Sequence, residues 1–331
     1  MLKLHHRSLS FRTTYFSLIA FLVLFSISIV HPADEASVYP GKLGIQKGRN
    51  LSAAEREVEA RFAEYLEKHT DEAIARYVKK YGKEINTDNA RELSTDYAPG
   101  GVDADDPATR AARTKWSSAV HEPSSAFTRE IYRHALAKIP PPNQRKQVIF
   151  TAGGAGAGKT TSIQQIPGLT QAVEAAEIIY DTTLSSLKSS TERIGQAISA
   201  GRTVSVIFVY RDPIDSFVGG VLPRAERTGR ILPLEAFLDT HIGAAAVLAK
   251  IAEAHRDDDR VAIAVVDNSR GRGKATQSDV GFVKTAAGKY RREELRGSLL
   301  NALDAAYEKG KRGQKEGISE SIYRGIKGHA P

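Results

Sequence analysis

Residues 150–163 read FTAGGAGAGKTTSI, and within them residues 153–160 have the spacing G-x-x-x-x-G-K-T. The motif follows the apolar run QVIFTA at 147–152 and precedes a stretch, 161–171, that is predicted to be helical. A glycine-rich loop between a strand and a helix is typical of a phosphate-binding P-loop. The sequence therefore predicts a nucleotide-binding protein of the α/β class.

Each part of this loop has an expected role. The glycines let the backbone bend so that its N–H groups face the β- and γ-phosphates of ATP, and the start of the following helix adds positive potential. Lys159 supplies a mobile positive charge, and the Thr160 hydroxyl is expected to bind Mg²⁺. The predicted ATP-binding residues are Gly153, Gly154, Ala155, Gly156, Ala157, Gly158, Lys159, Thr160 and Thr161.

Strands and helices continue to alternate beyond the P-loop. Short apolar runs read as strands buried on both faces, and helices between them serve as crossovers, which is the pattern of a doubly wound parallel sheet. The predicted strands are 147–152, 176–180, 203–210 and 260–266, and the predicted crossover helices are 161–171, 184–200 and 234–255.

Further helices are predicted on both sides of this region. Ser52 and Glu55 form a capping-box pattern at the start of a helical stretch, 52–81, which breaks near His69. Two more helices are predicted at 124–138 and 290–309. The predicted fold class is thus a P-loop kinase-like parallel sheet with flanking helices and a helical N-terminal extension.

The N-terminus has the pattern of a signal peptide or signal anchor. Lys3, Arg7 and Arg12 precede 18 uncharged residues, 13–30. As a helix this run would span about 27 Å, barely the hydrocarbon core of a bilayer. We expect the protein to be membrane-anchored or exported through this segment, which is also its one expected membrane contact. The alternative is a start codon placed too far upstream, in which case the protein is cytoplasmic.

Composition and charge narrow the classes of function. The chain has 331 residues and no cysteine, which excludes disulfides, thiolate zinc sites and thiol catalysis. Its formal net charge is +8, and residues 270–331 hold 14 lysines and arginines against seven acidic residues. Aromatic residues do not interleave these charges as a base-stacking platform requires, so we expect a solvated helix face and no nucleic-acid partner.

These features divide the chain into four predicted segments. The leader is assigned to 1–33, the helical extension to 34–82, the domain that carries the P-loop to 83–270 and a basic C-terminal helical tail to 271–331.

Asp181 ends the second predicted strand, at the edge of the sheet where ligands gather in such folds. It is expected to assist the Mg²⁺ ion or to take a proton. The alternative is that it only caps the helix predicted to begin near Leu184. Arg211 and Asp212 follow the third predicted strand on the same edge, where an ion pair between them would be structural only.

Three arginines lie in the segment VLPRAERTGRILP, 221–233, between the third and fourth predicted strands. Phosphoryl transfer needs cations over the equatorial oxygens of the transferring group. Arg224, Arg227 and Arg230 are therefore predicted to belong to a lid, with Gly229 and Pro233 as its joints. The alternative is an ordinary exposed loop that carries arginines.

The stretch INTDNAR, 85–91, is unusual for a helical region, because a short strand-like segment leads into Asp88 and a turn. By itself, Asp88 is as readily explained as the N-cap of a helix.

Taken together, these residues resemble the zeta-toxin family of P-loop kinases over about 83–270. AGGAGAGKTT resembles the family's Walker loop, IIYDTTL its second-strand element, VLPRAERTGRILP its arginine-bearing lid and VVDNS a strand end near the base. The resemblance implies a kinase that transfers the γ-phosphate of ATP to UDP-N-acetylglucosamine or a similar sugar nucleotide. It also implies an antitoxin-like protein as a partner.

The position of INTDNAR differs from the family's order. In the family the aspartate of a similar phrase is the general base and follows the P-loop, whereas here the phrase precedes it. A strand delivered from the N-terminal side can still join the sheet and bring Asp88 to the same edge as Lys159. The resemblance therefore implies Asp88 as base, with Lys159, Arg224 and Arg230 as the other catalytic residues.

Two other functions fit the same residues. One is a nucleotide-dependent binding or anchoring protein, and the other is a kinase for a different small hydroxyl substrate.

Overall fold

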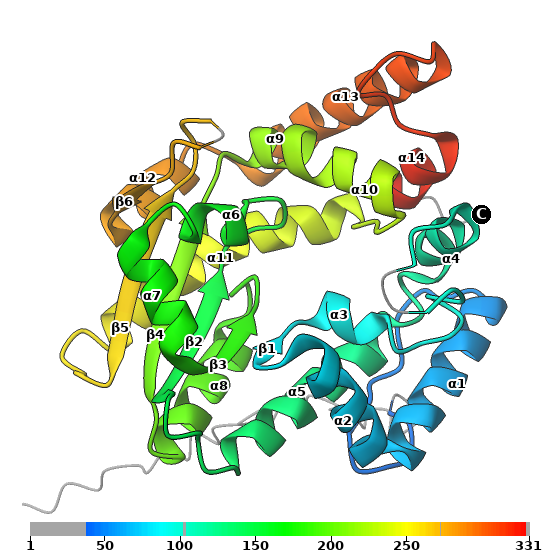
Figure 1. The fold of residues 1–331 in the computed structure, drawn as a ribbon. Helices are drawn as coiled ribbons and strands as arrows, with labels where there is room; N and C mark the ends of the chain where they lie inside the picture. Colours follow the sequence, from blue (N-terminus) through cyan, green and yellow to red (C-terminus); the bar gives the residue numbers. More distant parts are fainter. Residues whose placement is uncertain (1–37, 102–103, 272, 329–331) are drawn as a thin grey trace, which may run out of the picture. The chain divides into compact units, whose positions relative to one another are not determined.

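A central sheet of six strands organises the computed structural model, which describes residues 38–101, 104–271 and 273–328 (Figure 1). The order across the sheet is β1-β3-β2-β4-β5-β6, and every neighbouring pair is parallel except β5 with β6. This confirms the predicted α/β class. The predicted leader lies outside the described residues. The strands are β1 Glu84–Ile85, β2 Arg145–Ala152, β3 Ala176–Asp181, β4 Thr203–Tyr210, β5 Val261–Asp267 and β6 Thr276–Ser278.

The long strands are buried on both faces, as their continuous apolar runs predict. In β2, Phe150 belongs to the core under α5 and α8, whereas its neighbour Ile149 belongs to the core under α6 and α7. The same alternation occurs in β4, where Phe208 and Val209 lie in opposite cores. Successive side chains of a strand point to opposite faces, so helices must cover both sides of the sheet.

The edge strand β1 comes from before the P-loop. Glu84 lies opposite Ile179 and Ile85 opposite Tyr180, in parallel register with β3. The carboxyl ends of β1, β2 and β3 therefore lie side by side, which allows the segment after β1 to approach the P-loop.

The edge strand on the opposite side of the sheet is β6. It pairs antiparallel with β5 and is a strand that the sequence does not predict.

Helices cover both faces of the sheet, and the helices that precede the P-loop form a group beside β1 (Figure 1). Those before the P-loop are α1 Ala53–Lys68, α2 Thr70–Tyr81, α3 Thr87–Arg91, α4 Pro107–Trp116 and α5 His121–Leu136. Those after it are α6 Lys159–Ile163, α7 Pro167–Ala175, α8 Leu187–Ser199, α9 Pro213–Ser216, the π-helical turn η2 Phe217–Val221, α10 Leu222–Thr228, α11 Leu234–Ala254, α12 Val280–Ala287, α13 Arg292–Lys311 and α14 Glu320–Lys327.

Local chemistry explains where the helices differ from prediction. The helix expected at 161–171 is two helices, because Pro167 cannot continue a helix and instead begins α7. The helix expected from Leu184 begins at Leu187, since Leu184 has a φ of 58° and the Ser186 side chain caps the first turn. Helix α4 was not predicted. It begins with Asp106 as the N-cap and Pro107 at the first helical position, and both residue types are common at helix N-termini.

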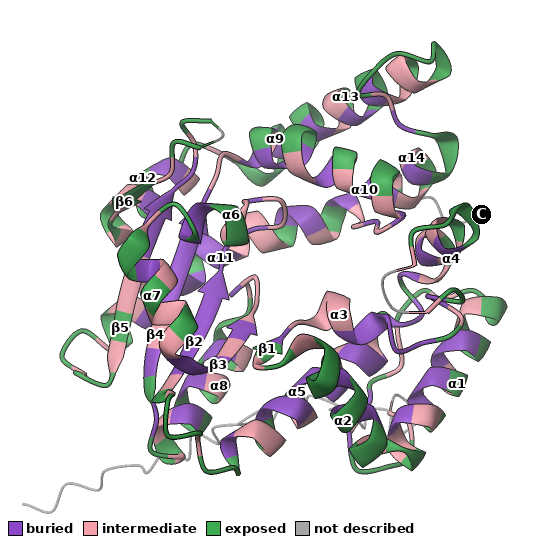
Figure 2. Cartoon of the chain, in the orientation of Figure 1, coloured by how far each residue is buried: buried purple, intermediate pink, exposed green. Residues whose placement is uncertain are grey.

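The arginine-bearing segment 221–233 is mostly helical rather than a loop. Helix α10 carries Arg224 and ends at Gly229, whose φ of 73° closes the helix in the left-handed conformation. Beneath it lies a core of its own (Figure 2). This lid core is built from Phe217, Val221, Leu222, Ala225, Ile231, Leu234, Phe237, Leu238, Leu295, Leu299, Leu303, Ala306, Ile318, Ile322 and Ile326.

The basic C-terminal segment thus supplies α13 and α14 to the lid core, while the basic side chains face outward. Residues 38–331 form one compact unit by their contacts. Within the described residues, no helix has the length and apolar character needed to cross a membrane.

Candidate active site

The P-loop connects β2 to α6 and depends on glycine at three positions. Gly153 has a φ of 134°, and a Cβ there would lie 2.2 Å from the Val209 carbonyl oxygen. Gly156 has a φ of 75°, and its Cβ would lie 2.5 Å from the Ser216 carbonyl oxygen. Gly158, with a φ of 78°, directly precedes Lys159 at the start of α6. Side chains at the first two positions would collide with the backbone of β4 and α9, so only glycine lets the loop pack against them.

Three side chains from different elements bind successive carbonyl groups of this loop. His241 Nε2 lies 2.8 Å from the Ala155 oxygen, Arg211 Nη1 donates to Gly156 at 3.3 Å, and Asn268 Nδ2 donates to Ala157 at 2.8 Å. These contacts tie the loop to α11 and to the ends of β4 and β5. No local pattern predicts His241 or Asn268 as loop partners, because these contacts join residues 86 and 111 positions apart.

His241 acts on the loop as a neutral side chain. Burial lowers the pKa of His241 to about 4, and the positive charge of Lys159 adds to this effect. The carbonyl oxygen of Ala155 can only accept, so Nε2 must carry the proton and donate it. The ring also occupies the space in which a Cβ on Gly154 would lie, at 2.4 Å.

The ion pair between Arg211 and Asp212 that the sequence suggested is not among the contacts of the described residues. The Asp212 carboxylate caps α9 by accepting from Ile214 N at 2.9 Å, and it also accepts from the Tyr290 hydroxyl. Arg211 is thereby available to the P-loop.

Asp181 links the three strands at this edge of the sheet. Its Oδ1 accepts from the Thr151 hydroxyl at 2.8 Å and lies 3.4 Å from Lys159 Nζ, while its Oδ2 accepts from Asn86 Nδ2 at 2.7 Å. Helix α8 is capped by Ser186. The alternative prediction of Asp181 as the helix cap is therefore wrong, and its carboxylate lies beside the P-loop lysine.

The donors present fit a Mg²⁺ ion that binds together with phosphate oxygens. No cluster of three or more His, Asp or Glu suited to a metal occurs among residues 38–101, 104–271 and 273–328. Mg²⁺ at phosphate sites keeps several waters and takes one or two protein oxygens, which the Thr160 hydroxyl and the Asp181 carboxylate can supply. When bound, the ion would neutralise charge on the phosphates.

Asp88 lies at the start of α3, yet it does not cap that helix. Asn86 is the cap, because its Oδ1 accepts from the backbone N–H of Asp88 at 2.7 Å. The Asp88 carboxylate is free to pair with Arg91 Nη1 at 3.4 Å and with Arg224 Nη2 at 3.3 Å. The capping interpretation of Asp88 is therefore wrong.

The charge around Asp88 sets its protonation. Burial by itself raises the pKa of this carboxyl, but four neighbouring positive charges outweigh burial and hold the pKa well below its usual value. The four are Arg91, Arg224, Arg230 and Lys159. Asp88 is therefore a carboxylate at neutral pH.

The fold thus brings the predicted site residues together from three separate segments. Asp88 follows β1. Lys159 follows β2 and the P-loop, and Asp181 is the last residue of β3. Arg224 and Arg230 come from the lid. Parallel strands place their carboxyl ends at the same edge, which is why residues so distant in sequence share one electrostatic environment.

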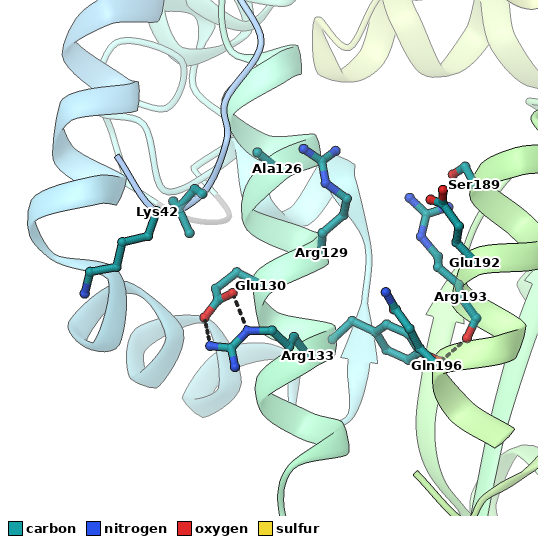
Figure 3. Close-up of a pocket in the computed structure, with 11 residues that line it drawn as sticks. Lys42, Ala126, Arg129, Glu130, Arg133, Ser189, Glu192, Arg193 and Gln196 are labelled. Carbon is teal, nitrogen blue, oxygen red and sulfur yellow. Dashed lines mark hydrogen bonds and ion pairs between the residues drawn. The ribbon is translucent and has the colours of Figure 1, made fainter. Parts of the chain in front are cut away.

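A separate cavity of about 170 Å³ lies between α5 and α8 and contains no P-loop residue (Figure 3). Arg129 and Arg133 line it from α5, and Arg193 lines it from α8. Arg133 pairs with Glu130, and the Arg193 guanidinium lies 4.8 Å from the centre of the Tyr180 ring. None of the predicted site residues lines this cavity.

Comparison with known proteins gives one family match. Residues 169–274 match the family model described as Zeta toxin, while no curated protein matches the chain. The matched range contains Asp181, Arg224 and Arg230 but neither the P-loop nor Asp88. This similarity to a P-loop kinase-like family, together with the sheet and the P-loop beside it, supports a kinase-like, nucleotide-binding function.

Proposed function

We propose that the protein is a zeta-toxin-like kinase that transfers the γ-phosphate of ATP to a hydroxyl of a sugar nucleotide such as UDP-N-acetylglucosamine. The observation that carries the proposal is the approach of Asp88 to the P-loop edge, 3.3 Å from the lid residue Arg224 and within the field of Lys159. A carboxylate at that position can accept a proton from an acceptor hydroxyl.

The transfer involves one proton and one phosphoryl group. The acceptor hydroxyl gives its proton to a carboxylate oxygen of Asp88, and its oxygen forms a bond to the γ-phosphorus. The bond from that phosphorus to the β–γ bridging oxygen breaks, and ADP leaves. Lys159, Arg224 and Arg230 supply positive charge where charge spreads over the transferring group.

The ion pairs of Asp88 suggest how substrate prepares the base. Phosphate oxygens attract guanidinium groups strongly and compete with Asp88 for Arg224. As Arg224 turns toward phosphate, the pKa of Asp88 rises toward its usual value because an opposite charge has been removed. The carboxylate is then a better proton acceptor than in the ion-paired state.

The acceptor is assigned from the family resemblance. A direct test uses protein that begins at Asp34, labelled ATP and a panel of sugar nucleotides, with Lys159→Ala as the control. We expect a phosphorylated UDP-sugar whose formation depends on Lys159.

Two other outcomes would redirect the assignment. ATP binding without any phosphorylated product would support the nucleotide-dependent binding protein instead. A product formed only from hydroxyl compounds outside the sugar nucleotides would retain the kinase and change its substrate. Circular dichroism of Lys159→Ala must match that of the unmodified protein, so that loss of product reflects the site.

A further inference from the structure

Glu92 is a buried carboxylate that joins the lid to the helices before the P-loop. Its Oε2 lies 2.8 Å from Arg113 Nη2, and its Oε1 accepts from Arg113 Nε at 3.1 Å and from Arg230 Nη2 at 2.7 Å. The Glu92 side chain is 1% exposed and that of Arg113 is 4% exposed. One carboxylate therefore holds a lid arginine on one side and a helix α4 arginine on the other.

The two lid residues beside Arg230 also contact α4. The Thr114 hydroxyl donates to the Gly229 carbonyl at 3.1 Å, and the Ser117 hydroxyl donates to the Ile231 carbonyl at 3.3 Å. A Cβ on Gly229 would lie 2.0 Å from the Arg110 carbonyl oxygen, so the backbones approach as closely as glycine allows. Three consecutive lid residues are thus docked on one surface.

The energetics make Glu92 a strong anchor. A buried charge is costly unless it is paired and hydrogen-bonded, and Arg113 satisfies Glu92 in a bidentate arrangement. Its Oε1 also accepts from Arg230 Nη2, so the same carboxylate binds a second guanidinium. A bond to one Nη of Arg230 orients the side chain and leaves its other N–H groups for a ligand.

We propose that Glu92 is a positioning residue that, supported by Arg113, holds Arg230 in place for phosphoryl transfer by docking the lid on α4. This inference rests on the proposed kinase function. It goes beyond the family match, because Glu92, Arg113 and all of α4 lie outside residues 169–274. The lid belongs to the matched range, and its docking surface comes from the chain's own N-terminal helices.

A double-mutant cycle separates positioning from general stabilisation. If Glu92 acts through Arg230, Glu92→Gln lowers kcat by about tenfold to a hundredfold, the range expected when a catalytic group is misplaced. Arg230→Ala lowers kcat as well, and the double variant is then no slower than Arg230→Ala alone. If the kcat reductions of the two single variants instead multiply in the double variant, Glu92 does not act through Arg230 and the proposal is overturned.

A second measurement reports lid docking without catalysis. The chain contains no cysteine and one tryptophan, Trp116, at the end of α4 beside Ser117. A fluorophore attached after Arg227→Cys, on exposed lid surface, accepts energy from Trp116 alone when tryptophan is excited selectively. Glu92→Gln should reduce this energy transfer in nucleotide-free protein, whereas unchanged transfer would show that Glu92 does not dock the lid.

Further variants protect the test against misfolding. Glu92→Gln leaves Arg113 buried without its full charge partner, so Thr114→Val is a second way to weaken docking that changes no charge. It should reduce energy transfer by a smaller amount, and Ala111→Ser, at an exposed position of the same helix, should leave it unchanged. Should the unmodified protein transfer no phosphate, the kinase assignment fails, while energy transfer still decides whether Glu92 docks the lid.

Discussion

Arg224 Nη2 lies 3.3 Å from Asp88 Oδ2, although 136 residues separate them in the chain. One residue follows an edge strand that precedes the P-loop, and the other lies on a lid helix well beyond it. Their ion pair joins the proposed base to the proposed phosphate-binding arginine. Together with Arg91, Arg230 and Lys159, Arg224 holds the pKa of Asp88 well below its usual value before substrate binds.

Replacing Asp88 by asparagine should separate binding from transfer. Asp88→Asn keeps the size of the side chain but removes proton-accepting capacity, so transfer should fall by about 10²-fold or more, the scale of general base catalysis. ATP affinity, measured by calorimetry, should be retained. An unchanged transfer rate would give Asp88 a structural role in holding Arg91 and Arg224.

Removing Arg224 should shift the pH dependence of kcat/KM. The free enzyme's Asp88 has a depressed pKa, so protonation of Asp88 should not limit kcat/KM above about pH 4. Arg224→Ala removes a positive charge, which raises the pKa of Asp88 and moves the acidic limb to higher pH. Arg227→Ala, at a lid arginine without an ion pair to Asp88 among the described contacts, is the matched control and should leave the limb in place.

His241 should make stability depend on pH. Its folded pKa is lowered to about 4, so the unfolded chain binds a proton that the folded protein does not, between about pH 6.5 and pH 4. Its contribution to the free energy of unfolding is complete above about pH 6.5 and declines as the pH falls through this window. The decline from about pH 7 to pH 5 should be about 2 kcal/mol.

Urea titrations at several pH values measure that decline. In His241→Gln it should be smaller by this amount, whereas His134→Gln on α5 should behave as the unmodified protein. Equal pH dependence in His241→Gln and the unmodified protein would mean that His241 is not held neutral against the P-loop.

The C-terminal helix should stabilise the lid. Ile326 on α14 is fully buried in the lid core, so Ile326→Ala should cost about 2–5 kcal/mol of unfolding free energy, the usual range for a large apolar side chain truncated in a core. The same change at Ile139, which is 92% exposed, is the control and should cost little. Equal effects at the two positions would show that α14 is not part of the cooperative fold.

Much of the sheet could be predicted because its signals are local. Strands β2, β3, β4 and β5 are short apolar runs bounded by polar residues, and each lies within a few residues of its predicted bounds. Helices α1 and α2 also follow the prediction, since a capping box and a break near His69 are visible in the sequence. Strand β6 was not predicted, because its three residues are all polar and form no apolar run.

The lid illustrates a signal that was present but incomplete. Its arginines were predicted to belong to a lid with Gly229 and Pro233 as joints, but no helix was predicted there, and the structure makes most of the segment helix α10. Burial of Leu222 and Ala225 against α13 and α14 favours the helix. That packing depends on partners about 70 to 100 residues further along the chain, which local periodicity cannot reveal.

The P-loop, the parallel sheet and the candidate site residues can be predicted from the amino-acid sequence, because glycine spacing, apolar runs and charged residues at strand ends are local signals. Which charged side chains meet depends on how distant segments pack. Whether Asp88 capped a helix or faced Arg224, and whether Arg230 lay free or on Glu92, depends on an edge strand pairing with β3 and a lid docking on α4. Those contacts follow from burial and pairing across the whole fold, and no local pattern encodes them.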